Sequence, residues 1–139
     1  MGEIRVNVRL ENEADIFLRE AGKLGRRKLR ALDIDAVVDT GAVMTLLPQD
    51  AVEALGVETR GSIVVQLAND QKIELPRTRG FRLTIAGRDM FTDCLVGPPG
   101  CEALIGQIVM ERLDLIADPA KRTLTPRPES PFLPTLKLK

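Results

Sequence analysis

The stretch that decides how this chain folds is VVDTGAVMTLLP, residues 37–48. It opens on two apolar residues, passes through Asp39-Thr40-Gly41-Ala42 and returns to apolar residues before Pro48. Asp, Thr and Gly are all common turn residues, so the simplest interpretation is a turn between two strands. At average composition this tetrapeptide occurs by chance in roughly one chain in several hundred of this length. Its context must therefore decide what it does.

Alternating apolar and polar residues predict strands on both sides of this stretch. Apolar side chains recur at every second position in residues 4–10 and 32–38, and the second segment runs straight into Asp39. Residues 63–67 and 73–75 form a predicted hairpin around a polar tip. Further strands are predicted over residues 81–85, 90–96, 113–117 and 121–124.

Two short helices are predicted among these strands. Gln49–Leu55 follows a proline and ends before Gly56, a residue suited to the position after a helix. Gln107–Arg112 follows Gly106. Many short strands with turn signals between them, and one or two short helices, indicate an all-β barrel or sandwich.

The composition limits the chemistry open to this chain. It has 139 residues, no His, two Cys, and equal numbers of basic and acidic residues. That length fits one compact domain. Without imidazole, Ser-His-Asp and Cys-His catalysis and the usual zinc sites are excluded. We expect no metal and no cofactor.

The charge balance and the first residues predict the surroundings of the protein. Zero formal net charge provides no field toward nucleic acid or anionic lipid, so neither partner is expected. The first twenty residues lack a signal-peptide pattern, and no segment approaches a membrane span. Cys94 and Cys101 are then expected to be reduced thiols. We therefore expect a cytoplasmic protein.

Two segments differ from the rest of a predicted domain over residues 1–125. Lys23–Arg30 is rich in basic residues, which is typical of a solvated loop; a nucleic-acid contact or a cleavable site is the alternative. Residues 126–139 contain four prolines and are expected to form an extended tail without its own core. This tail could equally pack on a partner subunit.

In this context the run around Asp39 resembles the signature of the retropepsin-like aspartic peptidases. That signature is an apolar pair, then Asp-Thr/Ser-Gly-Ala/Ser, then a Thr and apolar residues. Leu104-Ile105-Gly106 before a short helix resembles the second landmark of these enzymes, and residues 62–75 resemble their flap hairpin. The opening and the ending of the chain are similar to small bacterial members. The resemblance spans about residues 4–125 in the expected order.

The resemblance implies a fold and a set of site residues. The fold would be a closed acid-protease barrel, a half-site monomer that completes itself as a two-fold homodimer. Asp39 would be the catalytic carboxylate. The residues expected to support it or bind substrate are Thr40, Gly41, Ala42, Leu104, Ile105 and Gly106. The flap residues expected to cover the substrate are Leu67, Ala68, Asn69, Asp70 and Gln71.

Carboxylate chemistry explains why a dimer is needed. Hydrolysis of a peptide bond without a metal needs a base for water and an acid facing the carbonyl oxygen. Two carboxylates about 3 Å apart supply both roles, because they share one proton. The chain has one Asp-Thr-Gly, so the second Asp39 must come from another copy. The expected function is an aspartic endopeptidase acting on extended segments; the alternative is a dimeric peptide- or protein-binding module without catalysis.

Other reactive residues have simpler interpretations. Asp33 and Asp35 lie on the polar face of a predicted strand, and Asp118 precedes a proline in a predicted turn. Cys94 is expected to pack in a strand and Cys101 to be more exposed, and neither has an evident base.

The chain departs from the retroviral pattern at three places. Those relatives often carry an Asp directly after the Ala and an Arg directly after the second Gly, and the two pair. Here Val43 and Gln107 occupy these positions, so no unpaired charge is left. The expected flap tip, residues 69–71, contains no glycine.

Overall fold

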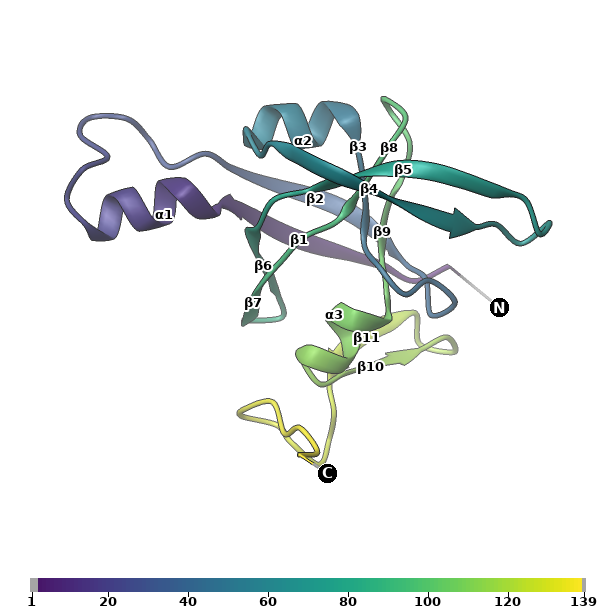
Figure 1. Ribbon diagram of the computed structural model, residues 1–139. Coiled ribbons are helices and arrows are strands. Elements are labelled where there is room, and N and C mark those ends of the chain that lie inside the picture. Colours follow the sequence, from purple (N-terminus) through teal and green to yellow (C-terminus); the bar gives the residue numbers. More distant parts are fainter. Residues whose placement is uncertain (1–2, 139) are drawn as a thin grey trace.

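The structure is a computed structural model that describes residues 3–138 (Figure 1). Within these residues it is mostly β, as the alternation predicted, with eleven strands and three short helices. In chain order the elements are β1 (Arg5–Asn12), α1 (Glu13–Glu20), β2 (Ala31–Val38), β3 (Leu46–Pro48), α2 (Gln49–Leu55), β4 (Thr59–Gln66), β5 (Lys72–Thr78), β6 (Phe81–Ile85), β7 (Arg88–Thr92), β8 (Leu95–Gly97), β9 (Ala103–Ile105), α3 (Gln107–Arg112), β10 (Leu115–Asp118) and β11 (Thr123–Pro126).

Nine strands form one sheet in the order β4-β5-β8-β3-β9-β2-β1-β6-β7, and β10 and β11 form a separate antiparallel pair. Two pairings within the large sheet are parallel, β2 with β9 and β3 with β8. Both need long crossover connections, which bring residues far apart in sequence side by side. The core is built from alternate residues of β1, β2 and β6 together with α2, β9 and α3.

The expected closed barrel is wrong for the described residues, because the sheet has two free ends. β4 pairs only with β5, and β7 only with β6. Figure 1 shows these ends on opposite sides of the molecule, with the β4–β5 hairpin projecting to the right. One residue pair, Arg77 with Leu95, joins this hairpin to β8, so most of it stands away from the sheet. Closure would require the end strands to pair, which this projection prevents.

The helices are three rather than one or two. α2 and α3 have the predicted bounds, and Gly56 caps α2 with a left-handed φ of 72°. The additional helix, α1, is capped at its N-terminus by Asn12, whose side-chain oxygen accepts a hydrogen bond from Asp15 N at 3.0 Å. No described helix is both long and apolar enough to cross a membrane.

The predicted return strand over residues 90–96 is two strands, β7 and β8. Between them Cys94 N donates to Thr78 Oγ1 at 3.0 Å, and Thr78 N donates to Cys94 O at 2.9 Å. The strand before this point, β7, pairs with β6, and the strand after it, β8, pairs with β5. The strand predicted over 113–117 likewise begins at Leu115, because Asp114 adopts a left-handed φ of 54°.

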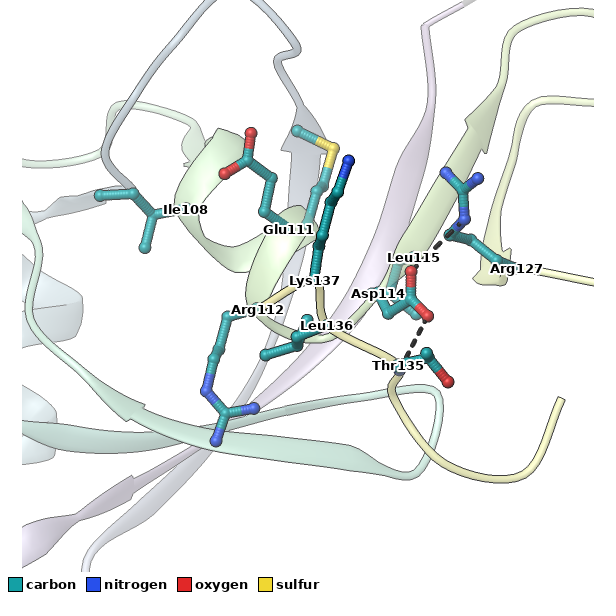
Figure 2. A pocket seen from close by; sticks show the side chains of 10 residues that line it. Ile108, Glu111, Arg112, Asp114, Leu115, Arg127, Thr135, Leu136 and Lys137 are labelled. Atoms are coloured by element: carbon teal, nitrogen blue, oxygen red, sulfur yellow. Dashed lines mark hydrogen bonds and ion pairs between the residues drawn. The ribbon is translucent and has the colours of Figure 1, made fainter. Parts of the chain in front are cut away.

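The tail folds back on its own chain around Asp114. One carboxylate oxygen, Oδ2, accepts hydrogen bonds from the Ser130 hydroxyl and from Thr135 N, the latter at 3.0 Å. Oδ1 lies 3.4 Å from Arg127 Nε. Figure 2 shows Asp114, Arg127 and Thr135 at a cavity of about 570 Å³ between α3, β10 and the tail. The predicted boundary between residues 125 and 126 falls within β11.

Buried Arg88 reinforces this attachment from the body of the protein. Its Nη1 donates to Leu113 O at 2.9 Å and to Asp114 O at 3.1 Å, and its Nη2 donates to Ser130 O. Three carbonyls from two segments thus depend on one guanidinium, which holds the tail against the end of α3.

We predict that acid loosens the tail. The Ser130 hydroxyl, then the Thr135 amide and Arg127, hold the pKa of Asp114 below its ordinary value. A lowered folded pKa means that this stabilisation is complete above the ordinary carboxyl value, roughly 4, and is lost as pH falls through the lower folded value. The amide resonance of Thr135 should therefore titrate with a midpoint below roughly 4.

In Asp114→Asn that titration should disappear, and amide exchange at Thr135 should rise about tenfold at pH 7. Asp118→Asn, in an exposed turn, is the control and should change neither. A Thr135 midpoint at or above the ordinary carboxyl value would contradict the assignment.

Two buried threonines provide a second prediction. Thr45 and Thr78 are each 3% exposed, but within residues 3–138 the Thr45 hydroxyl has no hydrogen-bond partner, whereas Thr78 Oγ1 accepts from Cys94 N. Thr45→Val should leave the free energy of unfolding unchanged or raise it by up to about 1 kcal/mol. Thr78→Val should lower it by about 1–3 kcal/mol, because the Cys94 amide loses its acceptor. Urea unfolding followed by circular dichroism measures both; equal losses would refute the distinction.

Candidate active site

Asp39 leaves the sheet between β2 and β9. The two strands are parallel, with Val38 opposite Ile105, and Asp39 N donates to Ile105 O at 3.0 Å. Parallel pairing with β9 therefore fixes the backbone amide of Asp39. Asp39 is half-buried, while Thr40 and Gly41 after it are exposed.

The loop after Asp39 folds around its own carboxylate. Asp39 Oδ1 accepts a hydrogen bond from Gly41 N at 2.9 Å, and Asp39 O accepts one from Ala42 N at 3.2 Å. A methyl group at Gly41 would stand 3.4 Å from Asp39 Oδ1, an ordinary van der Waals contact. No clash within the protomer therefore requires glycine at this position.

The start of α3 is hydrogen-bonded to this loop. Gln107 N donates to Ala42 O at 2.7 Å, and Ile108 N donates to Val43 O at 3.1 Å. A Cβ on Gly106 would lie 2.7 Å from the carbonyl oxygens of Val43 and Met44. Since real Cβ atoms do not come so close to backbone, only glycine allows α3 to approach the loop in this way.

A cleft of about 520 Å³ lies between the Asp39 loop and the β4–β5 hairpin. Most of the side chains that line it are apolar, and Asp39 is the one ionisable residue among them. The apolar residues are Ala42, Val43, Met44, Leu46, Ile63, Val64, Val65, Leu67, Leu75, Leu95 and Leu104. The cleft thus presents one carboxylate to an apolar space.

The predicted site residues divide into those at the cleft and those around it. Asp39, Gly41, Ala42, Leu104 and Leu67 line the cleft. Thr40 is exposed beside it, Ile105 is fully buried in the core, and Gly106 is buried under the loop. Of the expected pair of wall residues, Leu104 alone reaches the cleft.

The flap tip turns without a glycine. Asp70 adopts the left-handed conformation with a φ of 66°, and Asp70 N donates to Leu67 O at 2.9 Å. Gln71 N donates to Asn69 Oδ1 at 3.0 Å. Ala68 and the other tip residues are exposed. Asp and Asn tolerate such backbones and such local bonds, which explains a turn that glycine would otherwise supply.

The other acidic residues considered from the sequence are engaged elsewhere. Arg5 Nη1 donates to Asp35 Oδ2 at 2.8 Å, and Arg9 Nη1 donates to Asp33 Oδ2 at 3.2 Å, on the exposed face of β1 and β2. Asp118 Oδ1 accepts from Ala120 N at 3.0 Å in a turn. These carboxylates lie outside the cleft, as their simple interpretations predicted.

The cysteines and the acidic residues form no second reactive centre within residues 3–138. Cys94 and Cys101 are free thiols; Cys94 is buried and Cys101 half-buried. Burial raises the pKa of the Cys94 thiol to about 12, so it is not a thiolate nucleophile. In the same residues no group of three or more Cys, Asp or Glu is arranged to hold a metal ion.

Sequence reasoning missed two features of the site. The side chain of Gln107 donates from Nε2 to Thr40 O at 2.6 Å, although the sequence marked Gln107 only as a departure from a pattern. Val43 and Met44 join the cleft walls, although nothing but proximity to Asp39 indicated it. The paired replacement of Asp and Arg was the signal available for Gln107.

Comparison with known proteins identifies the family of the chain. A search of curated proteins finds no significant match. The family model described as "Aspartyl protease" matches residues 28–114. That segment is more than half of the chain and runs from the start of β2 through the Asp39 loop, the β4–β5 hairpin and α3. The chain belongs to the aspartyl protease family.

Proposed function

We propose that the protein is an aspartic endopeptidase that acts as a homodimer, with Asp39 of each protomer sharing one proton. The observation that carries this proposal is the single ionisable residue in an apolar cleft, Asp39, on a loop of an aspartyl protease family member. One protomer supplies one carboxylate to the cleft. The chemistry needs two.

The surface around the loop supports a second copy as partner. Thr40 and Gly41 are exposed, and so are the apolar side chains of Val43, 60% exposed, and Ile108, 44% exposed. In the proposed dimer these two apolar side chains would leave water, which favours association. A two-fold axis beside Thr40 would bring the two Asp39 carboxylates together, with Thr40 donating across the axis.

In the proposed reaction the ionised Asp39 of one protomer takes a proton from water, and the protonated Asp39 of the other donates to the carbonyl oxygen of the peptide bond. The oxygen of water then bonds to the carbonyl carbon. In the resulting tetrahedral intermediate the C–N bond breaks as the carboxyl that took a proton from water gives that proton to the amine nitrogen. One hydroxyl of the intermediate returns its proton to the other Asp39, so the product is a carboxylic acid and the dyad again holds one proton. The apolar walls exclude water from the site. Electrostatic interactions between the dyad and the reacting atoms are stronger there than in water.

The walls also indicate the substrate. Apolar side chains from the loop and the hairpin favour a peptide with apolar residues on both sides of the cleaved bond. β4 is an end strand of the sheet, so its backbone has hydrogen-bonding groups for an extended peptide added beside it. The flap residues Leu67–Gln71 would close over that peptide.

We predict that Asp39→Asn lowers peptide cleavage by at least about a thousandfold, because neither base nor acid remains in the dyad. The measurement is mass spectrometry of a peptide library incubated with the full chain between about pH 4 and 7. The profile of the wild type should be bell-shaped, since the reactive form holds one proton between two carboxylates. Asp33→Asn, on the exposed face of β2, is the control and should cleave like the wild type.

Mixing tests the dimer directly. Wild type and Asp39→Asn are mixed in equal amounts and compared with the same total amount of wild type. Random exchange of subunits should reduce activity to about one quarter, because about one quarter of the dimers then contain two wild-type protomers. Independent active monomers would retain about one half. Cleavage that is the same in wild type and Asp39→Asn would show that Asp39 is not the catalytic carboxylate and would refute the proposed dyad. Absence of cleavage from both proteins, while peptides still bind, would support the non-catalytic binding module instead.

A further inference from the structure

One peptide group in the Asp39 loop is held at both of its ends. Its carbonyl, Thr40 O, accepts a hydrogen bond from Gln107 Nε2 at 2.6 Å. Its amide, Gly41 N, donates to Asp39 Oδ1 at 2.9 Å. The two bonds share a single planar unit, because the carbonyl of one residue and the amide of the next belong to one peptide group.

The backbone of Gln107 is itself fixed against the loop. Gln107 N donates to Ala42 O at 2.7 Å, so this one residue binds the carbonyls on both sides of Gly41. Gly106 before it is pressed against the carbonyls of Val43 and Met44. The side chain of Gln107 therefore starts from a rigid position.

Thr40 has few other constraints. It is exposed, and within residues 3–138 its carbonyl accepts a bond from Gln107 alone. Without that donor the Thr40–Gly41 peptide group could rotate, and the Gly41 amide would turn away from the carboxylate. Gln107 is also exposed, so its side chain adds little to the core. Its effect on the loop is thus separable from its effect on stability.

We propose that Gln107 is a positioning residue that orients the Asp39 carboxylate through the Thr40–Gly41 peptide group. The inference rests on the proposed peptidase function. Gln107 does not line the cleft and would act through the backbone. Its side chain fixes the Thr40 carbonyl, which fixes the plane of the peptide group, and the Gly41 amide of that group fixes Asp39 Oδ1. Hydrogen bonds in such a chain polarise one another, so the Gln107 bond also strengthens the bond to Asp39.

The test compares Gln107→Met with Gln107→Lys. Methionine has a similar length and no donor, whereas lysine restores an N–H donor. Gln107→Met should lower kcat about tenfold to a hundredfold, because small displacements of a catalytic group have effects of that size. KM should change by less than about threefold, since binding surfaces are intact. Gln107→Lys should recover most of kcat.

A matched control exists in α2. Gln49 is likewise the first residue of its helix and exposed, and its Nε2 donates to Glu53 Oε1 at 2.9 Å. Gln49→Met should leave kcat and KM unchanged. All variants should keep the melting temperature of the wild type within about 2 °C.

A second readout needs no activity. In Gln107→Met, hydrogen exchange at the Gly41 amide should speed up about tenfold, and in Gln49→Met it should not change. Wild-type kcat together with wild-type Gly41 exchange in Gln107→Met would overturn the inference. So would a loss of kcat that follows a fall in melting temperature in both Gln107 variants. If cleavage does not depend on Asp39, the peptidase function fails, and Gly41 exchange alone then decides the role of Gln107.

Discussion

The parallel pairing of β2 with β9 is the constraint on which the site depends. It brings the backbone of Asp39 against Ile105, more than sixty positions later in the chain, and it aims the following Gly106 under the loop. Because a side chain at Gly106 would collide with two backbone carbonyls, the helix that follows can bond to the loop only at a glycine. The rest of the site is arranged around this contact.

The crossover between these two strands contains the other half of the cleft. It carries the β4–β5 hairpin, which is attached to the sheet at the end of β5, by the pairing of Arg77 with Leu95 and the hydrogen bonds between Thr78 and Cys94, and whose other end projects from the sheet (Figure 1). One connection therefore supplies both a rigid floor, through β3 and β8, and a projecting cover. Because the hairpin projects, β4 remains an end strand and the sheet does not close into a barrel. The same hairpin forms a wall of the cleft.

Local patterns in the sequence predicted what local physics decides. Proline and glycine signals gave the bounds of α2 and α3, and alternation gave most of the strands. The Asn12 cap of α1 was also readable, with acidic residues in the first turn, but the preceding strand pattern concealed it. The division between β7 and β8 could not be predicted from the sequence. It depends on a hydrogen bond from the backbone amide of Cys94 to the hydroxyl of Thr78, a residue distant in sequence. Sheet closure and the Gln107 bond likewise depend on contacts between distant segments.

The carboxylates of the protein differ in how many donors they already hold. Asp15 accepts bonds from Arg30 N, Nε and Nη2, and the Arg30 guanidinium lowers the pKa of that carboxyl. Asp114 is bound by two donors and faces Arg127. Carboxylates surrounded in this way stay ionised and have no oxygen left for a shared proton.

Asp39 is different, because within residues 3–138 its carboxylate accepts one hydrogen bond, from Gly41 N. That bond engages Oδ1 and sets the orientation of the group, while Oδ2 is left for a proton or for water. A proton shared between two carboxylates requires this combination of fixed direction and unused capacity. Asp50 has the same combination, because its Oδ1 accepts one hydrogen bond, from Gly100 N at 2.8 Å, but it does not line the apolar cleft. The cleft together with the hydrogen bonding is therefore the reason why we propose the chemistry for Asp39.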